Sequence, residues 1–187
     1  MLDKRMLETF KKIKLEYDKV EQVFASKKRA LVKITKGGVW GPSDCITIFK
    51  LFKKIRLERC GSFVDLGSGD GRVVLIASLF TKAIGFERDK ELINIGERIR
   101  KKLKLKCEFR NEDYCKHDLS KYGVLFVYPD KMTNQKLKEK LLKELKGRLF
   151  VYRIFKPNYL KKIKDYPTES NRTITEYINQ NGTARND

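Results

Sequence analysis

The sequence has almost no histidine and no closely paired cysteines. His117 is the single histidine, and the four cysteines, Cys45, Cys60, Cys107 and Cys115, include no C-x-x-C pair. Zinc sites and thiol-redox centres need clusters of these residue types, so the sequence excludes both. A Ser-His-Asp or Cys-His catalytic group would depend on His117, which lies in a loop-like segment with no nucleophile motif nearby. We therefore expect idle thiols, a surface histidine and no metal.

Long apolar runs are also missing. No run approaches the ~20 residues that a membrane-spanning helix needs. The first 19 residues carry a charge every few positions, unlike the continuous apolar stretch of a secretory signal. With 41% hydrophobic and 36% charged residues, the chain of 187 residues has the composition and length of one globular domain. We expect a soluble, cytoplasmic protein with no membrane partner.

Acidic residues are few beside basic ones. The 43 Lys and Arg residues outnumber the 24 Asp and Glu residues, which gives a formal net charge of +19. A field of this sign attracts polyanions, so RNA or DNA is a candidate partner through a basic surface. Enrichment in Lys and Glu is also typical of proteins from hot habitats, and the basic residues are scattered along the chain. Both explanations stay open.

Hydrophobic periodicity predicts an α/β fold. Apolar residues recur at three- and four-residue steps over 2–24, which indicates an amphipathic helix, and an irregular, turn-rich stretch follows over 25–42. Beyond it, expected strands at 62–66, 83–87, 107–111, 123–128 and 149–155 alternate with expected helices at about 43–57, 72–80, 90–105 and 133–146. This alternation predicts a doubly wound, mostly parallel sheet covered by helices, and the pattern at 173–179 suits an antiparallel edge strand.

A glycine-rich turn, D-L-G-S-G-D-G-R, links the first predicted strand to the next helix. Gly67, Gly69 and Gly71 allow a ligand to approach the backbone closely, beside the unpaired N–H groups of a helix start. A dinucleotide fingerprint needs G-x-G-x-x-G, and its last glycine would fall on Arg72. No Gly-Lys-Ser/Thr follows, so a phosphate-binding P-loop is excluded as well. The pattern favours a nucleotide-like ligand without phosphates, and Arg72 is assigned a structural role near Asp70.

Three carboxylates follow the ends of successive predicted strands. Glu87 ends the second strand, where a carboxylate can accept both hydroxyls of a ribose. Asp113 follows the third strand and suits the exocyclic amine of adenine, whereas Asp65 at the end of the first strand can face an ammonium or sulfonium group. Together they predict a site for S-adenosylmethionine.

These segments resemble class I S-adenosylmethionine-dependent methyltransferases over roughly residues 43–180. The segments W-G-P-S-D, D-L-G-S-G-D-G-R-V-V-L-I-A, G-V-L-F-V-Y-P-D and R-I-F-K-P further resemble the small archaeal protein-lysine methyltransferases and their mitochondrial relatives. The resemblance implies a Rossmann-like methyltransferase domain at 43–180, after an N-terminal helical arm at 1–42 and before a frayed tail at 181–187. The cofactor-binding residues that it implies, with the glycine turn, are Asp65, Gly67, Gly69, Gly71, Glu87, Asp113 and Tyr114.

The segment after the fourth strand indicates the methyl acceptor. It reads V-Y-P-D and lacks the Asn/Asp-Pro-Pro-Tyr/Phe tetrad by which many nucleic-acid methyltransferases hold a base amine. Tyr128 is predicted to line an acceptor channel, Trp40 to close it from the arm, and Asp130 to accept the proton of a lysine amine. The resemblance to the protein-lysine methyltransferases implies a lysine ε-amine of a protein as the expected acceptor, and the missing tetrad weakens the alternative of a base amine. An RNA or DNA methyltransferase is the alternative, and a non-catalytic, basic nucleic-acid-binding protein is a third possibility.

Overall fold

The computed structural model describes residues 4–26, 32–35, 38–129, 135–152, 155–169 and 171–180. Its helices are α1 (Lys4–Ser26), α2 (Cys45–Lys54), α3 (Arg72–Ala77), α4 (Lys90–Leu103) and α5 (Gln135–Glu144), with the short 3-10 helices η1 (Leu57–Arg59) and η2 (Tyr114–Lys116). Its strands are β1 (Lys33–Thr35), β2 (Gly38–Trp40), β3 (Ser62–Leu66), β4 (Lys82–Phe86), β5 (Glu108–Arg110), β6 (Val124–Val127), β7 (Arg148–Tyr152), β8 (Lys161–Pro167) and β9 (Thr173–Ile178).

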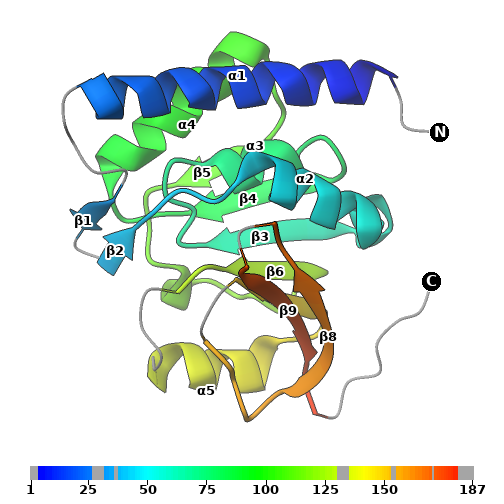
Figure 1. The fold of residues 1–187 in the computed structure, drawn as a ribbon. Coiled ribbons are helices and arrows are strands. Elements are labelled where there is room, and N and C mark those ends of the chain that lie inside the picture. The colour runs from blue at the N-terminus through cyan, green and yellow to red at the C-terminus, as the bar shows by residue number, and fades with distance from the viewer. Residues whose placement is uncertain are drawn as a thin grey trace.

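The described residues form a seven-stranded sheet with the order β5-β4-β3-β6-β7-β9-β8 (Figure 1). The strands from β5 to β7 are parallel, whereas β9 runs antiparallel to both β7 and β8. The chain leaves β3 toward β4 and β5, then returns to the other side of β3 with β6. This confirms the predicted doubly wound sheet, and its switch point between β3 and β6 is where such sheets bind ligands.

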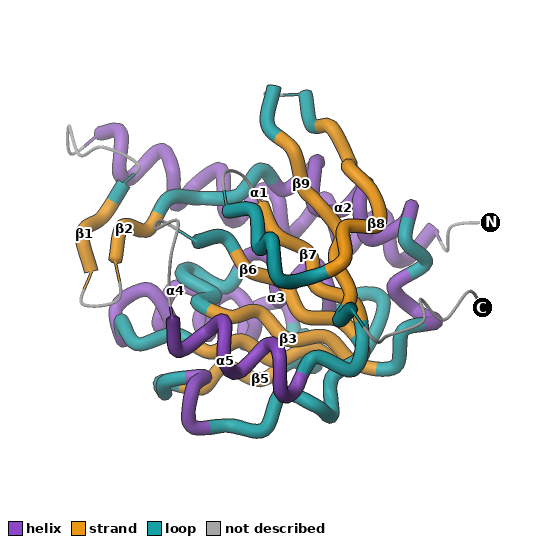
Figure 2. The backbone as a smooth tube through the Cα atoms, turned by 90° about the horizontal axis from the view of Figure 1, so that it is seen from below, coloured by secondary structure: helices purple, strands orange, loops and turns teal. Residues whose placement is uncertain are grey.

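Helices cover both faces of the sheet. Helices α1 to α4 lie on one side and α5 on the other (Figures 1 and 2). Side chains alternate between the two resulting cores, because Phe63 and Phe126 point toward α2 whereas Val64 and Leu125 point toward α5. A sheet that is buried on both faces needs strands made of continuous apolar residues. This feature made β3 and β6 predictable from the sequence.

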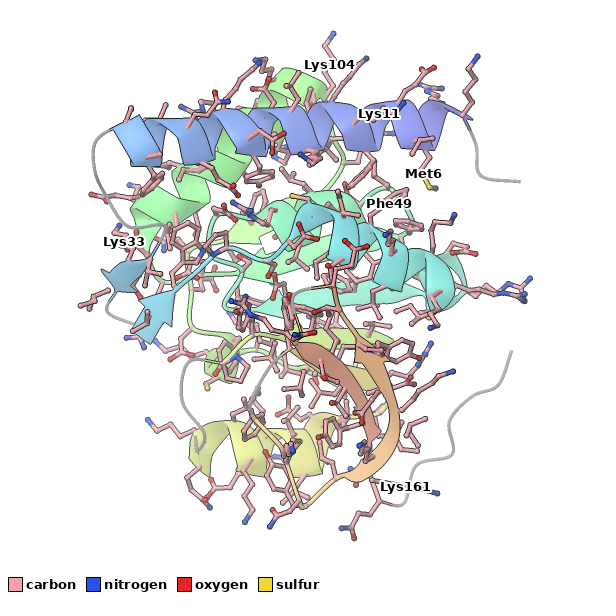
Figure 3. The ribbon with its side chains drawn as sticks, in the orientation of Figure 1. Met6, Lys11, Lys33, Phe49, Lys104 and Lys161 are labelled. Carbon is pink, nitrogen blue, oxygen red and sulfur yellow. The ribbon has the colours of Figure 1, made fainter. Side chains whose placement is uncertain are left out.

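Helix α1 is part of the main core. Its residues Phe10, Ile13, Tyr17 and Val20 are buried at the three- and four-residue spacing that the sequence predicts. The ring of Phe10 stacks on Phe49 of α2, with ring centroids 4.0 Å apart, and Figure 3 shows Phe49 pointing toward α1. The N-terminal helix is therefore fixed against the rest of the fold by apolar packing.

The region between α1 and α2 departs from the prediction of an irregular stretch. Strands β1 and β2 pair as an antiparallel hairpin, with Ile34 opposite Val39 and Lys33 opposite Trp40. Each strand has only three residues, so no alternation of apolar and polar residues can be recognised there in the sequence. Lys33 contacts Asp89 at 2.8 Å, so an ion pair holds the hairpin against the start of α4.

The C-terminal edge of the sheet also differs from the prediction. The strand at 173–178 is antiparallel as expected, but it lies inside the sheet, and β8 forms the edge. Strand β8 could not be predicted from the sequence, because six of its seven residues are exposed and no alternation of apolar and polar residues marks it. Lysines on an edge strand discourage pairing with other chains. The predicted tail at 181–187 lies outside the described residues.

Helix boundaries are shorter than predicted in several places. Helix α2 starts after its N-cap Asp44 and ends at Lys54, and α3 ends at Ala77. The predicted end at 57 falls on the buried Leu57, the first residue of η1, and the predicted end at 80 falls on a turn in which Phe80 is partly buried. No helix among the described residues is long and apolar enough to cross a membrane.

Candidate cofactor and acceptor site

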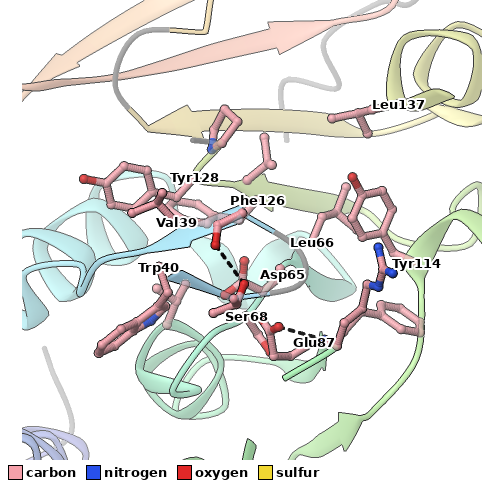
Figure 4. A pocket seen from close by; sticks show the side chains of 18 of the residues that line it. Val39, Trp40, Asp65, Leu66, Ser68, Glu87, Tyr114, Phe126, Tyr128 and Leu137 are labelled. Atoms are coloured by element: carbon pink, nitrogen blue, oxygen red, sulfur yellow. Dashed lines mark hydrogen bonds between the residues drawn. The ribbon is translucent and has the colours of Figure 1, made fainter. Parts of the chain in front are cut away.

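A cavity of about 920 Å³ opens at the carboxyl ends of β3, β4 and β6. Its wall includes residues of the β1–β2 hairpin, of the loop after β3, of η2 and of the first turn of α5. Figure 4 shows Trp40 and Tyr128 on one side, Glu87 and Tyr114 on the other, and Asp65 between them. Most of the sequence-predicted site residues thus line one cavity.

The glycine turn is held to the end of β4. The N–H groups of Gly67 and Ser68 both donate to the carbonyl of Phe86, at 2.9 and 2.8 Å. Gly67 has a φ of 90°, and a Cβ placed on it would meet no atom within 4 Å. Gly67 lines the cavity, so this open space lies where a ligand can contact the main chain.

The other two glycines of the turn face protein. A Cβ on Gly69 would lie 2.3 Å from Nε1 of Trp40, because the indole ring covers this glycine. A Cβ on Gly71 would lie 2.5 Å from the ring of Phe109. Both glycines have positive φ angles, so they determine the shape of the turn. Neither of them lines the cavity, although Ser68 and Asp70 do.

Glu87 accepts hydrogen bonds from three backbone N–H groups. Its Oε2 accepts from Gly69 at 2.8 Å, and its Oε1 accepts from Arg88 and Asp89 at 2.7 and 2.9 Å. The carboxylate therefore joins the glycine turn to the start of α4 while it lines the cavity. Charge-assisted hydrogen bonds of this kind fix its orientation toward a ligand.

Asp113 lies at the start of η2, and its Oδ1 accepts from the backbone N–H of Cys115 at 2.9 Å. This hydrogen bond lowers the pKa of Asp113 from its usual value, so the side chain is a carboxylate at neutral pH. The neighbouring Tyr114 also lines the cavity.

Asp65 has a very different environment. It is 3% exposed at the end of β3, and no hydrogen bond to its carboxyl group is present among the described residues. Burial raises its pKa well above the usual value, and the nearby carboxylates Glu87 and Asp70 raise it further. A cationic ligand in the cavity would stabilise the ionised form, so this residue suits a ligand that carries an ammonium or sulfonium group.

Arg72 lies behind the turn, as its assigned structural role requires. Its Nη2 contacts Asp70 at 2.7 Å, and its Nη1 contacts Glu21 of α1 at 2.7 Å. Its guanidinium carbon lies 4.6 Å from the centre of the Tyr17 ring, whose hydroxyl donates to the Asp70 carbonyl at 2.8 Å. These partners on α1 lie about fifty residues away in the chain and could not be predicted from the sequence. Burial moves the pKa of Arg72 down, but the adjacent carboxylate of Asp70 raises it overall.

The acceptor side of the cavity carries two aromatic rings from distant segments. Tyr128 follows β6, and its hydroxyl oxygen accepts a hydrogen bond from Nη1 of Arg172 at 3.3 Å. Its ring centroid lies 4.6 Å from that of Tyr152. Trp40 of β2 approaches from the hairpin. Asp130, the predicted proton acceptor, lies outside the described residues.

The prediction that His117 is a simple surface residue is wrong. Its ring is partly buried against Phe86, with centroids 4.5 Å apart, and its Nε2 lies 2.5 Å from an oxygen of Glu112. The short segment after β5 turns back under the end of β4, which a loop-like sequence does not reveal. His117 therefore packs beneath the cavity wall.

The strand order, the antiparallel β9 beside β7 and the glycine turn below a carboxylate-lined cavity are the architecture of class I S-adenosylmethionine-dependent methyltransferases. The chain is an S-adenosylmethionine-dependent methyltransferase, and its residues 65–155 match the ANTKMT methyltransferase domain. The site fits this cofactor, because Gly67 offers open main chain and Asp65 offers a buried carboxyl group that has no hydrogen-bond partner in the described part of the chain.

Solved structures support the same fold. An RNA methyltransferase from Salinibacter ruber, in complex with S-adenosyl-L-homocysteine, is 22% identical with a TM-score of 0.65, over 78% of this chain and 97% of that one. The putative methyltransferase YhhF from Escherichia coli is 13% identical with a TM-score of 0.59, over 79% and 91%. TehB from Haemophilus influenzae is 11% identical with a TM-score of 0.55, and this chain spans 61% of it. No curated protein sequence matches the chain.

Proposed function

We propose that this methyltransferase transfers a methyl group to lysine ε-amines of a protein. The observation that carries the proposal is the position of Tyr128 in the V-Y-P-D segment, at the cavity wall opposite Glu87 and on the same side as Trp40 (Figure 4). Aromatic faces favour alkylammonium groups, and the tetrad that holds a flat base amine is missing from this position. The match to the ANTKMT methyltransferase domain, a lysine methyltransferase-like family, also favours lysine.

The cavity residues are assigned to the parts of the cofactor as follows. Glu87 would accept from the ribose hydroxyls, Asp113 from the adenine amine beside Tyr114, and Asp65 from the ammonium group of the methionine part. Gly67 would contact the ligand through its main chain. Gly69 and Gly71 would contribute through the shape of the turn, since each packs against an aromatic ring of the protein.

The bound cofactor supplies the activated methyl group, so the protein has to align the acceptor and exclude water. Tyr128 and Trp40 would hold the alkyl chain of the lysine in line with the methyl group. A lysine amine is protonated at neutral pH and must lose its proton before it can react. Asp130 remains the predicted proton acceptor, directly or through a water molecule.

An RNA methyltransferase is the second candidate. The net charge of +19 and the fold shared with the Salinibacter ruber RNA methyltransferase favour it. Against it, exposed basic side chains lie on opposite sides of the molecule. Figure 3 shows Lys104 above the helices and Lys161 at the far end, near the sheet edge. A nucleic-acid site is expected to gather such residues on one face.

The test follows labelled methyl groups from S-adenosylmethionine into a cell extract that is divided and treated with protease or nuclease. We expect protease-sensitive label on lysine, with a wild-type rate that rises toward the lysine pKa of ~10.4 as more acceptor becomes neutral. Tyr128→Ala should lower the transfer rate on the order of a hundredfold, with cofactor affinity by calorimetry little changed, because the lost contacts align the acceptor.

Tyr159→Ala is the matched control, because this tyrosine does not line the cavity. It should leave the transfer rate per folded molecule close to that of the wild type. Label confined to the nuclease-sensitive fraction would refute the lysine proposal and favour the RNA candidate.

A further inference from the structure

The antiparallel end of the sheet brings a basic residue to the acceptor side. In the pairing of β7 with β9, Tyr152 lies opposite Ile174, so β9 begins beside the carboxyl end of β7. The carboxyl ends of β6 and β7 form the edge at which parallel sheets present ligands. Arg172 directly precedes β9, so it lies at the same edge of the sheet as Tyr128.

A tight turn fixes the backbone of Arg172. The N–H of Thr168 donates to the Arg172 carbonyl at 2.8 Å, and the N–H of Arg172 donates to the Thr168 hydroxyl oxygen at 3.2 Å. Asn171 has a φ of 53°, the left-handed conformation that closes such a turn. The strands β8 and β9 thus hold Arg172 in place on a closed hairpin end.

The side chain of Arg172 then reaches Tyr128. Its Nη1 donates to the Tyr128 hydroxyl at 3.3 Å, and Arg172 itself is half-buried. Tyr152, packed against Tyr128, has a buried hydroxyl without a hydrogen-bond partner among the described residues. The guanidinium thus contacts the hydroxyl of Tyr128, and of these three residues Tyr128 is the one that lines the cavity.

The acidic groups around Arg172 are engaged elsewhere. Glu169 contacts Lys50 of α2, Asp165 contacts Lys162 and Thr175, and Glu176 contacts Arg148 and Tyr166. Among the described residues Arg172 makes no ion pair. Across the cavity, Asp65 is the buried carboxyl group of β3, and Tyr128 and Tyr152 are the titratable groups of β6 and β7 on this side. The guanidinium charge is therefore not cancelled by a carboxylate of its own hairpin.

We propose that Arg172 is a positioning residue for methyl transfer, which orients Tyr128 and disfavours the protonated form of the acceptor amine. This inference rests on the proposed lysine acceptor. A positive charge beside an ammonium group lowers the pKa of that amine, so more of the acceptor is neutral at physiological pH. The hydrogen bond from Arg172 also fixes the position of the Tyr128 ring at the cavity wall.

The test compares Arg172→Gln and Arg172→Lys in the full chain, with the nuclease-treated protein fraction of a cell extract as the methyl acceptor. Transfer rates are measured from pH 6.5 to 9.5, and cofactor affinity by calorimetry. We expect Arg172→Gln to slow transfer about tenfold at neutral pH, with a loss that shrinks as pH rises, because the acceptor pKa moves up by about one unit. Arg172→Lys should keep most of the rate, and cofactor affinity should change less than twofold.

Arg100→Gln serves as the control, since Arg100 pairs with Glu97 on α4, away from the cavity. Its rate profile should match the wild type. A loss for Arg172→Gln that is equal at every pH, a parallel loss of cofactor affinity, or failure of Arg172→Lys would overturn the proposal for Arg172 alone. Wild-type label found only in nucleic acid would overturn the lysine acceptor, and with it this inference.

Discussion

Two acidic residues on the same strand and turn have opposite surroundings. Asp70 and Asp65 are 1% and 3% exposed, yet Asp70 is bound by the guanidinium of Arg72, whereas Asp65 has no hydrogen-bond partner among the described residues. We call the group behind the turn (Tyr17, Glu21, Asp70 and Arg72) the Arg72 cluster, and the group facing the cavity (Asp65, Glu87 and Asp113) the carboxylate wall. A buried carboxylate with its own cation serves the fold, whereas one without a cation is suited to a charged ligand.

The largest expected effect is the loss of stability when the Arg72 cluster is broken. Arg72→Met leaves Asp70 buried without its cation, and removing one partner of a buried ion pair costs about 3–5 kcal/mol of the free energy of unfolding. Chemical denaturation measures this change. The control Arg100→Met removes a half-buried pair on the surface of α4 and should cost less than about 1 kcal/mol. Equal losses for the two variants would mean that the cluster does not hold the fold.

Substitutions in the carboxylate wall should mainly lower the affinity for the cofactor, not the free energy of unfolding. Glu87→Ala removes charge-assisted hydrogen bonds to the ligand and should weaken S-adenosylmethionine binding by about 1.5–3 kcal/mol in calorimetry. Because three backbone N–H groups also lose their acceptor, the free energy of unfolding should fall by about 1 kcal/mol. Glu108→Ala, at a carboxylate of β5 that does not line the cavity, is the control. Unchanged affinity in Glu87→Ala would remove the ribose assignment.

The carboxylate wall could be predicted because its residues follow strands that are apolar enough to be recognised in the sequence. Asp65, Glu87 and Asp113 come after three successive apolar segments, and the ends of parallel strands meet at one edge of a sheet. All three line the same cavity. The glycine turn was readable for the same reason, although the sequence did not show that Gly69 and Gly71 face aromatic rings rather than the cavity.

The contacts behind and beside the site could not be predicted, since they depend on tertiary packing. Periodicity marks Tyr17 as buried, but nothing local shows that α1 crosses the start of α3 and brings Glu21 to Arg72. Arg172 reaches Tyr128 only because β9 runs back along β7, and its turn is closed by β8, a strand with almost no buried face. Pairings between segments far apart in the chain leave little local signal.

The smallest expected effect is a difference in how stability depends on pH between two members of the carboxylate wall, Asp65 and Asp113. The pKa of Asp65 is raised in the folded protein, so above its ordinary value of 3.8 the unfolded chain ionises first and the folded state loses relative stability as pH rises. Asp65→Asn removes this penalty and should stabilise the protein without cofactor by about 0.5–2 kcal/mol at pH 7. The gain should disappear near pH 3, where the carboxyl group is protonated in both states.

Asp113→Asn should show the opposite sign, which makes the pair a sharp test. The backbone hydrogen bond from Cys115 lowers the pKa of Asp113, so its carboxylate contributes stability above pH 3.8, and that contribution is lost as pH falls through the lowered value. Asp113→Asn should therefore destabilise the protein slightly at pH 7, by less than about 1 kcal/mol, and not at low pH. Thermal unfolding of both variants between pH 3 and 8 measures the two slopes. If Asp65→Asn also destabilises the protein at pH 7, Asp65 has a partner that stabilises its charge, and it belongs with Asp70 on the structural side of the comparison.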